Sequence, residues 1–162
     1  MAFTKLTAED LRKHKGVSFT GISTIFFCYD DKQRLFLAKR SKNARDEHGR
    51  WEPGAGGLKH GQSLIQNVRR ELKEEYDVTP LRIDFIGYWE AFRTLPDGTP
   101  SHWLLMSFAV KVNPSQLRIN EPDQVDDSGW FTLDTLPSPM HSQFAPFLEL
   151  HSETFKNIMA SA

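Results

Sequence analysis

The sequence predicts an α/β fold built around a mixed β-sheet. Runs rich in β-branched and aromatic residues alternate along the chain with segments whose apolar residues recur at helical spacing. The dipeptide Asp97-Gly98 separates two of these runs, which is typical of a β-hairpin. Strands interspersed with helices, together with one strong hairpin, favour an α/β arrangement in which the sheet is mixed.

The N-terminal part of the chain is predicted to contain a short helix followed by two strands. Thr7 can cap a helix that ends near residue 14. A β-branched and aromatic run predicts a strand over 17–29, and the polar residues at 30–33 supply a turn. A returning strand is predicted over 34–39, and the polar, basic segment 41–50 is predicted to be a loop.

A glycine-rich segment and a helix follow. Three glycines and a proline within residues 51–57 indicate irregular backbone with close approaches. Ser63 and Gln66 fit a capping box at the start of a helix predicted over 63–76, which Pro80 stops. The remaining predicted elements are strands over 81–93 and 101–112, a loop over 113–128, apolar structure at 130–131 and, after the prolines at 137 and 139, a helix over 145–159.

Composition indicates a globular protein with a single domain, residues 1–162. Of the 162 residues 39% are hydrophobic, and 20 Lys and Arg balance 21 Asp and Glu. This balance argues against bulk binding of nucleic acid or anionic membrane, although a few placed cations can still hold a small anionic ligand. The sequence has no apolar run of roughly 20 residues and no apolar N-terminal region, so we expect neither a membrane span nor a secretory signal.

The single cysteine, Cys28, lies within an apolar run. One cysteine allows neither an intramolecular disulfide nor a multi-cysteine zinc site. We therefore expect Cys28 to be a small buried hydrophobic residue, and we expect the protein to be located in the reducing cytoplasm.

Three glutamates share one arc of the helix predicted over 63–76. At about 100° per residue, Glu71, Glu74 and Glu75 overlap the edge of the apolar stripe, where like charges repel one another. Arg70 can offset part of this repulsion through a pair with Glu74. Either the arc is an ordinary solvated acidic face, or a divalent cation neutralises it. The glycine-rich segment before the helix favours the cation. Hard cations take oxygen ligands and usually complete their coordination shell with water and substrate phosphates, which a tight loop beside the helix can hold.

Residues 56–62 and 70–78 together resemble the Nudix box, whose pattern is G-x5-E-x7-R-E-U-x-E-E-x-G-U, with U an aliphatic residue. Two specified positions depart, because Gln62 replaces Glu and Asp77 replaces Gly. The matching positions are Gly56, Arg70, Glu71, Leu72, Glu74, Glu75 and Val78. The strand that ends in Arg40, Trp51 before the glycines, and Trp130-Phe131 followed by Leu136-Pro137 also resemble the family.

The resemblance implies a fold and a reaction. The implied fold is an α/β/α sandwich around a mixed sheet, with its core over about 17–155. The implied reaction is metal-dependent hydrolysis of a pyrophosphate bond in a nucleoside diphosphate linked to another group, assisted by Mg²⁺ or Mn²⁺. Glu74 and Glu75 are implied as metal ligands. Glu71 is implied as a further ligand or as the base that activates water, with Arg70 orienting it.

In many members of the family the base is instead an acidic residue of a late loop. The candidates here are Glu121, Asp123, Asp126 and Asp127. An ordinary solvated loop is the alternative interpretation of these four residues.

The expected partner is a small nucleotide-type substrate, without bulk nucleic acid or membrane, and a homodimer is left open. Arg40 is the preferred phosphate-binding cation of the basic stretch, which also contains Lys39, Lys42, Arg45 and Arg50. Gly56 and Gly57 are expected to approach the substrate. One aromatic residue of the hairpin could stack on a nucleobase, with Trp103 as our candidate among Trp89, Phe92, His102 and Trp103.

The two departures from the box have different consequences. Gln62 keeps the shape and hydrogen-bonding reach of Glu but loses its charge, so we expect fewer bound metals or lower activity. Asp77 ends the helix, where a left-handed conformation is usual, and we expect a small loss of stability there. A catalytically weak or inactive sensing module on a Nudix fold is the alternative function. An isomerase of the isopentenyl diphosphate type would need a reactive cysteine, and Cys28 is a poor candidate.

Overall fold

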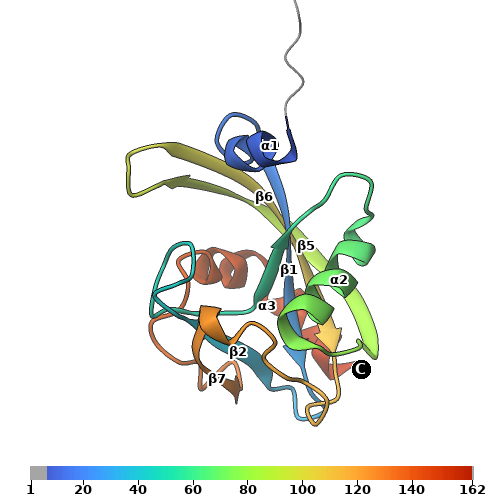
Figure 1. Cartoon of the computed structure of the whole chain (residues 1–162). Helices are drawn as coiled ribbons and strands as arrows, with labels where there is room; N and C mark the ends of the chain where they lie inside the picture. Colours follow the sequence, from blue (N-terminus) through green and yellow to red (C-terminus); the bar gives the residue numbers. More distant parts are fainter. Residues whose placement is uncertain (1–6, 162) are drawn as a thin grey trace, which may run out of the picture.

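A seven-stranded mixed β-sheet forms the centre of the structure, a computed structural model that describes residues 7–161 (Figure 1). Its strands are β1 (Gly21–Tyr29), β2 (Leu35–Arg40), β3 (Trp51–Glu52), β4 (Gly54–Gly57), β5 (Arg82–Thr94), β6 (Pro100–Lys111) and β7 (Val125–Phe131). The main path runs in the order β3-β2-β1-β6-β5, while β4 pairs with β1 and β7 pairs with β2. Strands β1 and β6 are parallel and the other pairs are antiparallel, which confirms the predicted mixed sheet.

Helices α2 (Leu64–Tyr76) and α3 (Phe144–Ala160) cover opposite faces of this sheet. Successive side chains of β1 point to opposite faces, so that Phe26 packs in a cluster with Leu72 of α2 while Phe27 packs with Phe147 of α3. The strand is therefore apolar without alternation because both of its faces are buried. This arrangement confirms the α/β/α sandwich. The chain also forms a short helix α1 (Ala8–His14) and a 3₁₀ turn η1 (Pro122–Gln124).

Several element boundaries differ from the sequence predictions. The first strand begins at residue 21, not 17, because residues 15–19 turn back after α1 around Gly16, whose φ is +77°. The glycine-rich segment is not simply irregular, since it forms two short strands: β3 pairs with β2, and β4 pairs with β1. The loop predicted over 113–128 contains η1 and the start of β7, which pairs with β2 over a long sequence separation. Helix α3 begins at Phe144.

The ends of α2 follow the predicted local chemistry. The side chain of Ser63 accepts a hydrogen bond from the N–H of Gln66, and the side chain of Gln66 accepts one from the N–H of Ser63, which confirms the capping box. Asp77 ends the helix in the left-handed region with φ of 45°. Lys73 donates to the Asp77 carboxylate.

Cys28 is buried at 1% exposure, as predicted, and burial raises the pKa of its thiol. A deprotonated, nucleophilic thiolate is therefore disfavoured at this position. No helix within residues 7–161 is both long enough and apolar enough to cross a membrane.

Candidate active site

Strand β4 and the residue after it, hereafter the glycine loop (residues 54–58), lie between β1 and α2. Gly56 pairs with Thr24 of β1 in antiparallel register. A Cβ atom at Gly56 would collide with the carboxylate of Glu71, so only glycine lets α2 approach this closely. The glycine loop thus lies against Glu71 of α2. This agrees with the sequence prediction that the glycine-rich segment and the acidic helix share one site.

Asn67 joins the glycine loop, β1 and α2, although sequence reasoning did not identify it. Its Nδ2 donates to Thr24 Oγ1 at 2.8 Å and to the Gly56 carbonyl at 3.1 Å. Its Oδ1 accepts from Arg70 Nη2 at 2.6 Å. Asn67 is fully buried. Its one sequence signal is an amide at the edge of the apolar stripe of α2, where a buried polar group needs partners.

Arg70 is the centre of a second network. Its guanidinium donates to Glu71 Oε1 at 2.5 Å and to Glu74 Oε2 at 2.6 Å. Its Nε donates to Gln62 Oε1 at 3.2 Å. Gln62 therefore joins the segment after the glycine loop to α2 as a neutral acceptor, which is the supporting role expected for it from its shape.

The three glutamates of α2 have different surroundings. Glu71 is buried, and burial raises its pKa while the hydrogen bond and charge of Arg70 lower it. Burial raises the pKa of Glu75 well above its ordinary value, and the charges of Glu71, Glu52 and Glu121 raise it further. Glu74 is 47% exposed and pairs with Arg70. Of the three predicted metal ligands, Glu71 is therefore buried, Glu75 is half-buried and Glu74 lies at the surface.

The carboxylates fit a hard divalent cation by their chemistry. Glu75 lies near three other acids, Glu71, Glu52 and Glu121, and Arg40 and Arg70 are already paired with Glu52 and Glu71. Such a cluster is stable only if it holds protons or a cation. No three His, Cys, Asp or Glu side chains within the described part of the chain converge closely enough to hold an ion as they stand. Arg70 draws Glu71 and Glu74 toward itself, so binding of a cation requires these carboxylates to turn.

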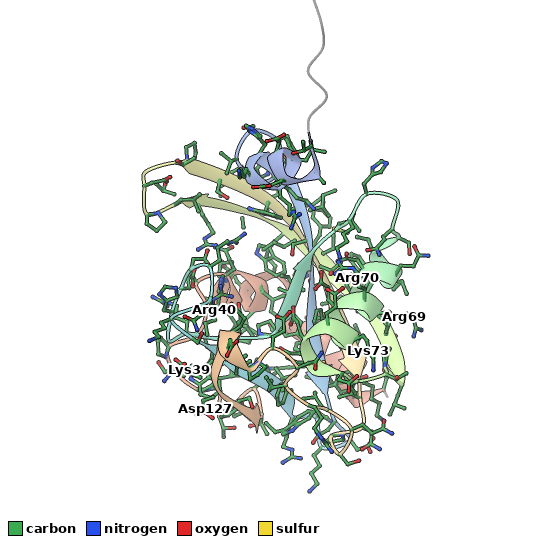
Figure 2. The ribbon with its side chains drawn as sticks, in the orientation of Figure 1. Lys39, Arg40, Arg69, Arg70, Lys73 and Asp127 are labelled. Atoms are coloured by element: carbon green, nitrogen blue, oxygen red, sulfur yellow. The ribbon has the colours of Figure 1, made fainter. Side chains whose placement is uncertain are left out.

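A cavity of about 390 Å³ opens beside these residues. Its acidic end is formed by Glu52, Glu75 and Glu121, which lie close enough to influence one another electrostatically. Of the four acids predicted in the late loop, only Glu121 lines the cavity. Asp127 instead lies opposite Lys39 in the register of β7 and β2. Figure 2 shows Asp127 and Lys39 on one side of the molecule and Arg70 of α2 on the other.

Glu52 is a second residue that sequence reasoning missed. It lies on β3 and is half-buried, and burial raises its pKa to about 7 although the charge and hydrogen bond of Arg40 lower it. Arg40 also donates to Asp46 Oδ1 at 3.0 Å and to the Asp46 carbonyl at 2.6 Å. The predicted phosphate-binding cation lines the cavity, but its guanidinium is used by the protein itself. The signal for Glu52 was its place between Trp51 and the glycines.

The hairpin aromatics divide into two groups. Trp89 and Trp103 line the cavity, whereas Phe92 and His102 stack on each other, with ring centroids 4.3 Å apart, and do not line it. Trp103 packs over the backbone of β1, and the guanidinium of Arg45 lies over its ring at 5.8 Å from the centroid. Arg45 is 72% exposed and lies 3.7 Å from Asp46 Oδ2, so it is an accessible cation over an aromatic wall of the cavity.

Relatives found by sequence are named as hydrolases that act on RNA. The RNA pyrophosphohydrolase of Acinetobacter baylyi is 26% identical over 115 residues, which are 62% of this chain and 66% of that protein. The NAD-capped RNA hydrolase NudC of Pseudomonas aeruginosa is 30% identical over 91 residues, which are 55% of this chain and 29% of that protein. The chain thus spans less than two thirds of the length of either relative.

Solved structures share the fold. A MutT NUDIX hydrolase from Burkholderia pseudomallei superposes with a TM-score of 0.70 at 24% identity, covering 81% of this chain and 97% of that one. The NUDIX domain of Shewanella oneidensis NrtR, complexed with ADP ribose, gives a TM-score of 0.62 at 17% identity, covering 89% and 96%. The family model described as NUDIX domain matches residues 20–151, and this chain therefore belongs to the Nudix family.

Proposed function

We propose that the chain hydrolyses a pyrophosphate bond in a nucleoside diphosphate linked to another group, with a divalent cation bound by the glutamates of α2. The observation that carries this proposal is the gathering of one buried acid, Glu71, and two half-buried acids, Glu75 and Glu52, beside the glycine loop at one end of a cavity. The names of the two sequence relatives support the same class of reaction.

Mg²⁺ or Mn²⁺ is the cation we propose, held by Glu71, Glu74 and Glu75. When bound, it would neutralise negative charge on phosphate oxygens. The protein supplies the geometry for this. Arg70 holds Glu71 and Glu74 in place until they turn, and Asn67 keeps the glycine loop against the helix.

Two carboxylates compete for the role of general base. A base must lie within hydrogen-bond reach of the attacking water. Glu71 is only 8% exposed and its Oε1 already accepts from Arg70 at 2.5 Å. Glu121 is exposed, lines the cavity and lies close to Glu75. We therefore assign the base to Glu121 and a structural or ligand role to Glu71.

The substrate is proposed to lie along the cavity, with its phosphates on Gly56 and Gly57 and its base on Trp103. Both glycines line the cavity, and backbone without side chains permits close approach. Trp103 offers an indole face for stacking. Arg40 acts indirectly in this arrangement, by holding Glu52, while Arg45 is the accessible cation.

A substrate panel with product identification tests the reaction. The panel contains nucleoside triphosphates, nucleotide sugars, dinucleoside polyphosphates, and RNA with triphosphate or NAD at its 5′ end, each with Mg²⁺ and Mn²⁺. We expect Glu75→Gln to lower turnover by orders of magnitude in a folded protein, and Glu149→Gln, an exposed glutamate of α3, to leave it unchanged. No turnover of any substrate, or equal turnover by the Glu75 variant, would overturn the proposal.

The base assignment has its own comparison. Glu121→Gln should lower kcat by roughly 10²- to 10⁴-fold, the usual contribution of a general base, while Mn²⁺ affinity changes little. Asp126→Asn is the matched control, because Asp126 is exposed in the same segment but does not line the cavity. A larger loss of kcat in Glu71→Gln, with Mn²⁺ affinity retained, would transfer the role of base to Glu71.

A further inference from the structure

The segment that precedes the family-matched region packs directly on the candidate active site. The match begins at residue 20, yet the N–H of His102 donates to the Gly16 carbonyl at 2.8 Å. A Cβ at Gly16 would collide with the indole of Trp103. Figure 1 shows α1 beside the β5–β6 hairpin. Gly16 therefore packs behind Trp103, which itself lines the cavity.

Lys15, which ends α1, extends from this segment to the glycine loop. Its ammonium donates to the Leu58 carbonyl. It lies 3.4 Å from the position that a Cβ at Gly57 would occupy, so glycine leaves open space beside the ammonium. Burial and the charge of Arg70 lower the pKa of Lys15, and the charge of Glu71 raises it. Lys15 is thus close to both residues, at the proposed phosphate position.

The donors of Lys15 are not all used. An ammonium has three N–H donors, and within residues 7–161 Lys15 forms one hydrogen bond, to Leu58, and no ion pair with a carboxylate. The other cations at this end of the site are already paired: Arg40 with Glu52, Arg70 with Glu71 and Glu74, and Lys59 with Glu74 at 3.8 Å. A half-buried ammonium with free donors is suited to an oxyanion.

We propose that Lys15 is a substrate-binding residue, whose ammonium contacts a phosphate of the pyrophosphate chain above Gly57 while it holds the glycine loop through Leu58. The assignment rests on the proposed function, because it takes a pyrophosphate as the ligand. It adds a cation from outside the Nudix box and outside the family-matched region. A positive charge here strengthens binding of the phosphates and opposes binding of the metal.

These opposite expected effects on phosphate affinity and metal affinity distinguish the proposed role of Lys15 from a purely structural one. The probe is methylenediphosphonate, a pyrophosphate analogue that cannot be hydrolysed, titrated calorimetrically in the presence of saturating Mn²⁺. A second titration measures Mn²⁺ alone. The variants are Lys15→Met and Lys15→Gln, which remove the charge, and Lys15→Arg, which keeps it. Lys13→Met is the matched control, because Lys13 is 68% exposed on the same helix and pairs with Glu9.

We expect Lys15→Met and Lys15→Gln to weaken the probe about tenfold, as for loss of one charge-assisted hydrogen bond. Mn²⁺ alone should bind them equally well or more tightly, and Lys15→Arg should retain most of the affinity. Weaker binding of both the probe and Mn²⁺ would show a loosened loop and would overturn the proposal. Unchanged probe binding, or no binding by the wild type, would overturn it as well. Lys15-dependent probe binding in a wild type that hydrolyses nothing would refute only the proposed function.

Discussion

Replacement of Asn67 by alanine tests whether the site is held together from inside the molecule. Asn67 is fully buried, and its amide bonds to β1, to the glycine loop and to α2. Alanine keeps the helix propensity of this position. The substitution therefore removes the network without disturbing the helix itself.

The structure gives the expected magnitude. Asn67→Ala removes three hydrogen bonds, to Thr24 Oγ1 at 2.8 Å, to the Gly56 carbonyl at 3.1 Å and from Arg70 Nη2 at 2.6 Å. At about 1 kcal/mol net for each bond, the free energy of unfolding should fall by about 3 kcal/mol. For a chain of this size, that loss corresponds to a decrease in Tm of roughly 6–12 °C.

Urea denaturation and calorimetry of the metal-free protein measure this loss, and turnover measures its consequence for the site. The control is Asn157→Ala on the exposed surface of α3, where a change within about 0.5 kcal/mol is expected. The reasoning would be refuted by a loss below about 1 kcal/mol together with wild-type turnover. Such a result would mean that the glycine loop keeps its position without Asn67.

Two further predictions concern the cavity and its acids. Trp103→Leu should raise the KM for a nucleotide substrate roughly 5- to 100-fold, the effect of losing one base–aromatic stack. The control Phe92→Leu, outside the cavity, should leave the KM unchanged. Equal KM values for the Trp103 variant and the wild type would exclude stacking on Trp103. Burial raises the pKa values of Glu71 and Glu75, and it raises that of Glu52 to about 7. The folded, metal-free protein therefore keeps protons that the unfolded chain releases above about pH 4.5. The stability gained from these protons is lost as the pH rises through about 7. Because a cation replaces those protons, Mn²⁺ should raise the Tm more at about pH 8 than at about pH 5.5, and equal shifts at the two values would contradict the assignment.

The sequence by itself determined the parts of the site that depend on neighbours along the chain. The capping box at Ser63 and Gln66 and the spacing of the glutamates define α2 and its acidic arc. The match to the Nudix box predicted that the glycine loop and this helix form one unit. Glycine is required at Gly56 because a Cβ there would meet the Glu71 carboxylate, although only the tertiary structure reveals that contact.

Tertiary structure decided which of the candidate residues have free side chains and which share one cavity. Local spacing treats Glu71, Glu74 and Glu75 alike, but packing against β1 and the glycine loop buries Glu71, half-buries Glu75 and leaves Glu74 exposed beside Arg70. Pairing of β7 with β2 selects Glu121 from four similar acids. Charge partners distant in sequence occupy Arg40 and bring Glu52 to the site. These outcomes depend on contacts between segments that periodicity does not relate, so composition and spacing could not assign them.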